Sequence, residues 1–202
     1  MMPTYTYDNF SKHLPIWEEH VFKYLSYLNE QKSHFLDIGS GEGAATLWML
    51  NNLAGQTYSR VYSVDVWPQK ETEKTFNRNI AESELSYKNI KMKGNHAHQL
   101  YELFFTVQNG MAFKFNFIYA NCTTQSADAM LVLLNAFNLL KDDGIMVVNN
   151  YDTKHKINLL GGQAVHYREA VLFFLRLYAG RVEILHEGKQ LIFRKISLST
   201  LF

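Results

Sequence analysis

The run from Phe35 to Gly43, which reads FLDIGSGEG, constrains the fold more than any other stretch of the chain. A short apolar segment ends in an acid, and three glycines follow at alternate positions. Glycine allows positive φ angles and lets a ligand approach the bare backbone. The apolar stretch from Ala44 to Leu50 reads as a helix. The run therefore predicts a buried strand, a tight turn and a helix N-terminus whose amides attract polar groups.

Two classes of nucleotide ligand are compatible with this turn. The spacing Gly39-x-Gly41-x-x-Ala44 also fits the fingerprint of dinucleotide-binding turns. Asp37 favours a different ligand, because a carboxylate before the turn repels a pyrophosphate but suits a cationic or hydroxyl-bearing group. A second acid, Asp65, closes the apolar segment 60–65, and an acid there holds a ribose in doubly wound folds. A turn that binds no ligand is the simplest alternative.

Composition indicates a globular protein. The chain has 202 residues, 47% of them hydrophobic and 19% charged, which is enough for one domain over residues 1–202 with a helical N-terminal cover over 1–30. The net charge of +1 provides no long-range field, so we expect neither a nucleic-acid nor a membrane partner. The single cysteine, Cys122, excludes an intramolecular disulfide, and no signal peptide is recognisable; a cytoplasmic protein is the expectation.

Hydrophobic periodicity predicts alternating helices and strands. The expected helices cover 14–30, 43–54, 70–85, 98–107, 126–140 and 163–178, and the expected strands cover 34–38, 60–65, 89–93, 115–120, 145–148, 181–186 and 191–195. Such alternation implies an α/β fold, a Rossmann-like doubly wound sheet that is mostly parallel with helices on both faces. Ligands of such sheets bind beyond the carboxyl ends of the strands. The turns at 39–43, 65–67, 94–96, 121–124 and 149–151 are therefore expected to converge.

Several motifs together resemble one family. These are the N-terminal pattern from Asn9 to Trp17 (NFSxHxPxW), the run from Phe35 to Gly43, the segment 117–119, the helix end 139–144 and the close from Arg181 to Gly188. They are similar to the methyltransferase 24 branch of the class I methyltransferases that depend on S-adenosylmethionine (SAM), relatives of the catechol O-methyltransferases. The resemblance implies a seven-stranded sheet with an antiparallel last strand, and SAM as cofactor.

The resemblance also implies roles for individual residues. The glycine turn would line the methionine part of SAM, Asp37 would reach its amino group, and Asp65 would hold the ribose hydroxyls. The adenine would lie between Val66 and Trp67 and meet the turn after the third strand. The cofactor-binding residues implied are Asp37, Gly39, Ser40, Gly41, Gly43, Asp65, Val66, Trp67, Asn95, His96 and Asn121. For Trp67 a surface position, and for His96 a solvated turn, are the alternatives.

The chain departs from the family at two strand ends. The fourth strand is followed by Asn121 and the fifth by Asn149-Asn150-Tyr151, where relatives carry acids. Amide oxygens replace carboxylates poorly as magnesium ligands, so we expect no metal site. Tyr151, Asp152 and His155 are candidates for a catalytic base, with His166 further along the chain.

The expected function is methyl transfer to a small polar acceptor. Two other functions stay open: a degenerate SAM-binding protein with a sensing or scaffold role, and a nicotinamide oxidoreductase. The sequence predicts neither the acceptor nor the oligomeric state.

Overall fold

The computed structural model describes residues 3–108, 113–121, 126–152, 156–158 and 164–197. The chain divides into two compact units, residues 1–95 and 96–202, which are described separately; a single domain over 1–202 stays a prediction. Within the described residues, seven strands form a mixed, mostly parallel sheet. This confirms the predicted Rossmann-like class.

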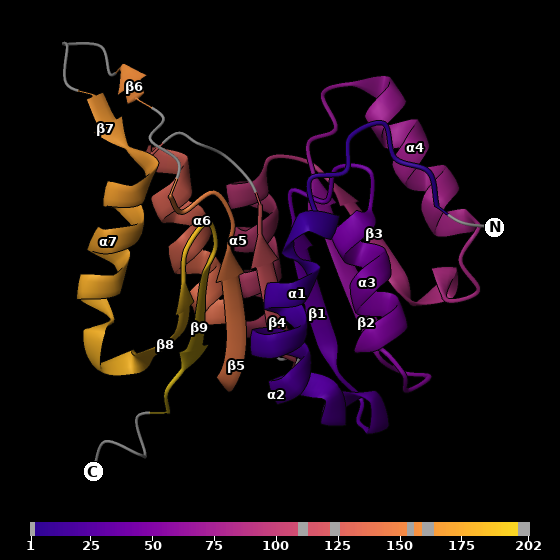
Figure 1. Cartoon of the computed structure of the whole chain (residues 1–202), viewed down its shortest axis with the longest axis horizontal. Coiled ribbons are helices and arrows are strands. Elements are labelled where there is room, and N and C mark those ends of the chain that lie inside the picture. The colour runs from indigo at the N-terminus through magenta and orange to yellow at the C-terminus, as the bar shows by residue number, and fades with distance from the viewer. Residues whose placement is uncertain (1–2, 109–112, 122–125, 153–155, 159–163, 198–202) are drawn as a thin grey trace. The chain divides into compact units, whose positions relative to one another are not determined.

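Unit 1 begins with a helical stretch and continues as alternating strands and helices (Figure 1). The helical stretch from Ser11 to Glu30 contains α1 (Leu14–Trp17), a π-helical turn (Glu18–Phe22) and α2 (Lys23–Leu25), with 3-10 turns at both ends. The remaining elements are β1 (His34–Ile38), α3 (Ala44–Asn52), β2 (Arg60–Asp65), α4 (Lys70–Ala81), a 3-10 turn (Ser86–Lys88) and β3 (Asn89–Lys93).

The three strands of unit 1 are parallel, in the order β3-β2-β1. Every residue of β1 is buried, as its apolar run predicts, and α3 packs against β1 and β2. Trp17 of the N-terminal stretch is fully buried and meets Phe10 and Trp48 edge-on, with ring centroids 4.7 and 4.9 Å apart. The N-terminal stretch is thus part of the core of unit 1.

Unit 2 contains the second half of the sheet, with strand order β4-β5-β9-β8. β4 and β5 are parallel, and β9 runs antiparallel to both of its neighbours, as predicted for the last strand. The elements are α5 (His96–Gln108), β4 (Phe115–Ala120), α6 (Ser126–Leu139), β5 (Leu140–Val148), β6 (Lys156–Asn158), β7 (Ala164–His166), α7 (Tyr167–Leu177), a 3-10 turn (Ala179–Arg181), β8 (Val182–Glu187) and β9 (Leu191–Lys195).

Several predicted boundaries were wrong, and the helix predicted over 70–85 ends at Ala81. The helix predicted over 163–178 starts at Tyr167, because β7 precedes it and pairs antiparallel with β6. The strand predicted over 145–148 starts at Leu140, because α6 ends at Leu139. The buried ammonium of Lys195 donates to the carbonyls of Phe137 and Leu140 at 2.9 and 2.8 Å, which supplies the helix end with donors from a distant strand.

Candidate functional site

The turn after β1 has the backbone that its three glycines predict. Gly39, Gly41 and Gly43 have φ angles of 79°, 52° and 92°. Gly43 is the left-handed N-cap of α3, and a Cβ there would lie 3.1 Å from Cδ2 of Phe76. At Gly41 a Cβ would meet no atom within 4 Å. The turn therefore packs against Phe76 at Gly43 and is open at Gly41, where a ligand can approach the backbone.

The carboxylate of Asp65 joins two backbone segments. Its Oδ2 accepts from the amide of Gly41 at 2.8 Å, and its Oδ1 accepts from the amide of Trp67 at 2.9 Å. Asp65 is 9% exposed. Asp65 thus fixes the glycine turn to the segment that follows β2.

Trp67 lies under the glycine turn and is only 3% exposed, which excludes the surface position left open by the sequence. Its Nε1 donates to the carbonyl of Gly41 at 2.8 Å, so Gly41 is held through both its amide and its carbonyl. The ring packs on Phe76 and lies 4.5 Å from the ammonium of Lys91. Its φ of 41° is unusual for a bulky residue, and these contacts maintain it.

Asp37, at the end of β1, is fully buried. Its Oδ2 accepts from the hydroxyl of Thr46, whereas its Oδ1 is buried without a hydrogen-bond partner among the described residues. Burial, to which the charge of Asp65 adds, raises the pKa of Asp37 to about 7. An acid with one unsatisfied oxygen and a high pKa is suited to a cationic ligand, which would favour the ionised form.

A chain of polar side chains lies behind Asp37 and was not recognised in the sequence. Asn89 donates through Nδ2 to the hydroxyl of Ser63 at 2.7 Å, and that hydroxyl is 3.0 Å from the hydroxyl of Thr46. Because Thr46 donates its proton to Asp37, Ser63 must donate to Thr46. All the donors therefore point toward the carboxylate and partly offset its burial. Only the parallel pairing of β1, β2 and β3 brings these residues together.

The predicted cofactor residues do not all belong to this cluster. The side chain of Ser40 donates to the carbonyl of Asp37 at 2.9 Å and so stabilises the turn. Val66 is 38% exposed beside the buried Trp67, and Asn95 is exposed at the end of unit 1. His96 and Asn121 belong to unit 2. Unit 1 by itself thus brings together Asp37, Gly39, Ser40, Gly41, Gly43, Asp65 and Trp67.

Unit 2 carries a row of amides at its strand ends. Asn149 donates through Nδ2 to Oδ1 of Asn121 at 2.6 Å, and its own Oδ1 accepts from Nε2 of Gln190 at 3.0 Å. Asn149 and Gln190 are buried. Gln190 lies just before β9 and was not predicted; no local sequence signal distinguishes it. These neutral side chains lie just after β4, just after β5 and just before β9, and they orient one another through hydrogen bonds.

Of the candidate bases, Tyr151 is now the least suited. Its hydroxyl donates to Oε1 of Glu187 at 2.8 Å, and burial together with this carboxylate raises the pKa of Tyr151. A phenol that holds its proton more tightly is a poorer base at neutral pH. Asp152 is exposed. His155 and Cys122 lie outside the described residues, and the side chain of His166 is not described either.

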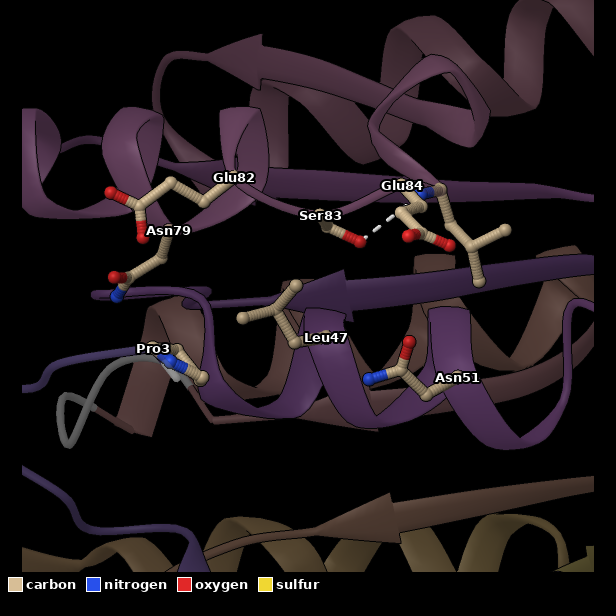
Figure 2. Close-up of a pocket in the computed structure, with 8 residues that line it drawn as sticks. Pro3, Leu47, Asn51, Asn79, Glu82, Ser83 and Glu84 are labelled. Carbon is tan, nitrogen blue, oxygen red and sulfur yellow. Dashed lines mark hydrogen bonds between the residues drawn. The ribbon is translucent and has the colours of Figure 1, made fainter. Parts of the chain in front are cut away.

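A separate pocket of about 400 Å³ lies in unit 1 between α3 and the end of α4. Figure 2 shows Asn79 and Pro3 at one end, Leu47 in the middle, and Glu84 with Asn51 at the other end. None of the predicted cofactor residues lines it.

The residues with described positions contain no group of three or more His, Cys, Asp or Glu side chains that could hold a metal ion. Among those same residues, no helix has the length and apolar character needed to cross a membrane.

The comparison with family models found one match. A model described as "Methyltransferase domain", of the methyltransferase 24 type, matches residues 36–151, which is more than half of the chain and includes the glycine turn together with Asn121 and Asn149. No curated protein matches the sequence.

Many solved structures share the fold at low sequence identity. The O-methyltransferase TomG from Streptomyces achromogenes, in complex with SAM, has a TM-score of 0.63 at 15% identity, covering 89% of this chain and 80% of that one. An rRNA methylase from Streptococcus thermophilus has a TM-score of 0.62 at 13% identity, covering 91% and 97%. MycE of the mycinamycin pathway, with Mg, SAH and mycinamycin VI, has a TM-score of 0.62 at 16% identity, covering 94% and 51%.

Proposed function

Because the chain belongs to the methyltransferase domain family, a class I group that depends on SAM, we propose that it methylates a small polar acceptor without a metal ion. The observation that supports this most is the arrangement around Gly41. The turn is open above this residue, and Asp65 and the half-bonded Asp37 lie at the ends of adjacent strands. This arrangement of two carboxylate acceptors beside an open backbone turn fits a ligand with a cationic amino acid end and a ribose.

In this proposal Asp37 faces the amino group of SAM, and the glycine turn together with the first amides of α3 surrounds its carboxylate. Asp65, at the end of β2 beside the turn, accepts from the ribose hydroxyls. Val66, half exposed beside Asp65, contacts the adenine. The ring of Trp67 is buried, so it supports the adenine site from beneath the turn.

SAM supplies an electrophilic methyl group on a positively charged sulfur. The acceptor oxygen forms a bond to this methyl carbon, the bond to sulfur breaks with its electron pair, and S-adenosylhomocysteine (SAH) leaves. Holding the two partners in line can account for up to about 7–11 kcal/mol of the barrier. The acceptor proton passes to a base or to water, and Asp152 is the described candidate with an exposed carboxylate.

The small acceptor and the absence of a metal are supported by charge. The chain has a net charge of +1, which gives a polyanion such as RNA no long-range attraction. The oxygens of Asn121 and Asn149 already accept from neighbouring amides, and a neutral amide compensates poorly for the dehydration of magnesium.

The proposal is tested by calorimetry followed by turnover. The natural protein should bind SAM and SAH but not NAD, and should convert SAM to SAH with at least one member of a panel of hydroxyl compounds and sugars. Methylation of an rRNA fragment included in the panel would contradict the small acceptor. Binding of NAD without SAM would contradict the whole proposal.

One observation favours a second function. Asn121 and Asn149 stand where the resemblance implies acids, and the side-chain oxygen of each accepts a hydrogen bond from a neighbouring amide. A protein that binds SAM or SAH as a sensor needs no base and no metal. Tight SAH binding without turnover on any acceptor would favour this alternative.

A further inference from the structure

Residues 3–8, here called the N-terminal strap, lie against the glycine turn of unit 1. The side chain of Glu42, between Gly41 and Gly43, accepts through Oε2 from the amides of Thr6 and Tyr7 at 2.6 and 3.3 Å. A carboxylate that binds two successive backbone amides forms charge-assisted bonds. The strap is therefore attached to a side chain that belongs to the turn itself.

Asn79 of α4 forms a second attachment. It is 2% exposed, and its Nδ2 donates both to the carbonyl of Glu42 at 3.0 Å and to the carbonyl of Thr4 at 3.1 Å. Its Oδ1 accepts from the amide of Thr4 at 3.3 Å. Arg78 adds a bond to the hydroxyl of Thr4 at 2.6 Å. One buried amide thus binds the strap and the glycine turn at the same time.

Tyr5 lies between these two points in the chain and is partly buried. Burial, with smaller contributions from the charges of Asp8 and Glu42, raises the pKa of Tyr5 to about 12. The strap is thus held by side chains of both the turn and α4, and by partial burial of one of its own. In Figure 1 it runs from the N-terminus beside α4.

We propose that Glu42 and Asn79 are positioning residues which couple the strap to cofactor binding; this rests on the proposed function of the turn. With the strap bound, the peptide of Glu42 is fixed from both sides, so the amides of the turn are preorganised for the ligand. Because coupling between two binding events is reciprocal, a ligand in the turn must hold the strap more tightly in return. The strap then acts as a cover whose order depends on occupancy of the turn.

The first experiment measures SAH binding by calorimetry in three variants. Glu42→Ala removes the carboxylate oxygen that accepts from both strap amides and should weaken SAH about five- to tenfold. Glu42→Gln keeps a neutral acceptor and should recover most of the affinity. Glu82→Ala is the matched control. Glu82 lies beside Asn79 at one end of the neighbouring pocket and forms no described bond with the strap (Figure 2). Thermal unfolding should be nearly the same in all three.

The second experiment measures hydrogen exchange in a peptide that contains Thr6 and Tyr7. SAH should slow exchange of these amides in the natural protein and in Glu82→Ala, but not in Glu42→Ala. A role confined to stability would not produce a response to ligand.

Each outcome distinguishes this inference from the proposed function. SAH binding with unchanged strap exchange, or equal affinity of Glu42→Ala and the natural protein, would overturn the coupling alone. Failure of the natural protein to bind SAH would overturn the proposed function and with it the coupling. If the coupling holds, the strap amides of Glu42→Ala should exchange faster than those of the natural protein even without ligand. Equal exchange rates would contradict the attachment itself.

Discussion

Asp37 is a fully buried acid whose environment differs at its two oxygens. Its Oδ2 accepts from Thr46, which is hydrogen-bonded to Ser63 and through it to Asn89, whereas Oδ1 has no described partner. Burial dominates and raises the pKa of Asp37 to about 7. Between pH 4 and 7 the unfolded chain has lost this proton and the folded chain keeps it, so stability falls as the pH rises through that window.

This pKa predicts a pH dependence of SAM binding. The cationic amino group of SAM favours the ionised form of Asp37. Affinity for SAM should therefore rise from pH 6 to pH 7.5, the range in which Asp37 of the unliganded protein loses its proton. In Asp37→Asn the rise should disappear, and stability should no longer fall between pH 4 and 7. Calorimetry at several pH values measures the first effect and thermal unfolding the second. An equal slope in both proteins would contradict the pairing of Asp37 with the ligand.

Asp65 combines a structural role, through its bonds to the amides of Gly41 and Trp67, with the binding role that we propose. Asp65→Ala leaves the amides of Gly41 and Trp67 without acceptors, at a cost of about 1–3 kcal/mol for each buried amide. We expect a lower unfolding temperature and at least tenfold weaker SAM binding.

Asp65→Asn should be nearly as harmful to binding, because its amide nitrogen faces one of the two backbone donors. Glu84→Ala, an exposed acid of the same unit, is the control. Calorimetry that gave equal SAM affinity for Asp65→Asn and the natural protein would show that the carboxylate is not needed.

At the scale of elements, β1, the turn and α3 form a strand–turn–helix motif in which two glycines have different functions. Gly43→Ala places a Cβ against Phe76 in a left-handed conformation and should destabilise the protein by about 1–3 kcal/mol. At Gly41 the same change meets no neighbouring atom. Its Cβ fills the space that we assign to the ligand.

The two glycine variants should therefore differ in both measurements. Both variants strain a left-handed residue, but only Gly43→Ala adds a contact with Phe76, so it should lower the unfolding temperature more. Gly41→Ala should weaken SAM binding more than Gly43→Ala does. Thermal unfolding and calorimetry on the two proteins check this. If Gly41→Ala bound SAM as well as the natural protein, the open space at Gly41 would not be the ligand site.

Over the whole molecule, charge is nearly balanced, and Asn121 and Asn149, which follow β4 and β5, are neutral. Chelator should change neither SAM affinity nor turnover, because Asn121 and Asn149 offer only amide oxygens that are already bonded. The triple variant Asn121→Asp, Asn149→Asp and Asn150→Asp should bind magnesium or calcium, since a cation relieves the repulsion between its new carboxylates.

Calorimetry with each ion measures this gain, and Asn51→Asp, at an exposed site on α3, is the control. Activity of the natural protein that was lost with chelator and restored by magnesium would show that these amides do bind a metal.

The sequence by itself determined the alternation of strands and helices, the glycine turn and the two acids that end β1 and β2. These features are local: apolar runs, turn residues and spacing along the chain fix them, and the family match to residues 36–151 agrees with them. The antiparallel β9 followed from the resemblance and was confirmed by its pairing with β5 and β8.

Only the tertiary structure decided which polar groups meet. The pairing of β1 with β2 and β3 brings Asn89 and Ser63 behind Asp37, and the packing of α4 brings Asn79 to Glu42 and the strap. The inward position of Trp67 depends on a carbonyl 26 residues away. Such contacts join residues far apart in the chain, and no local propensity or periodicity encodes them.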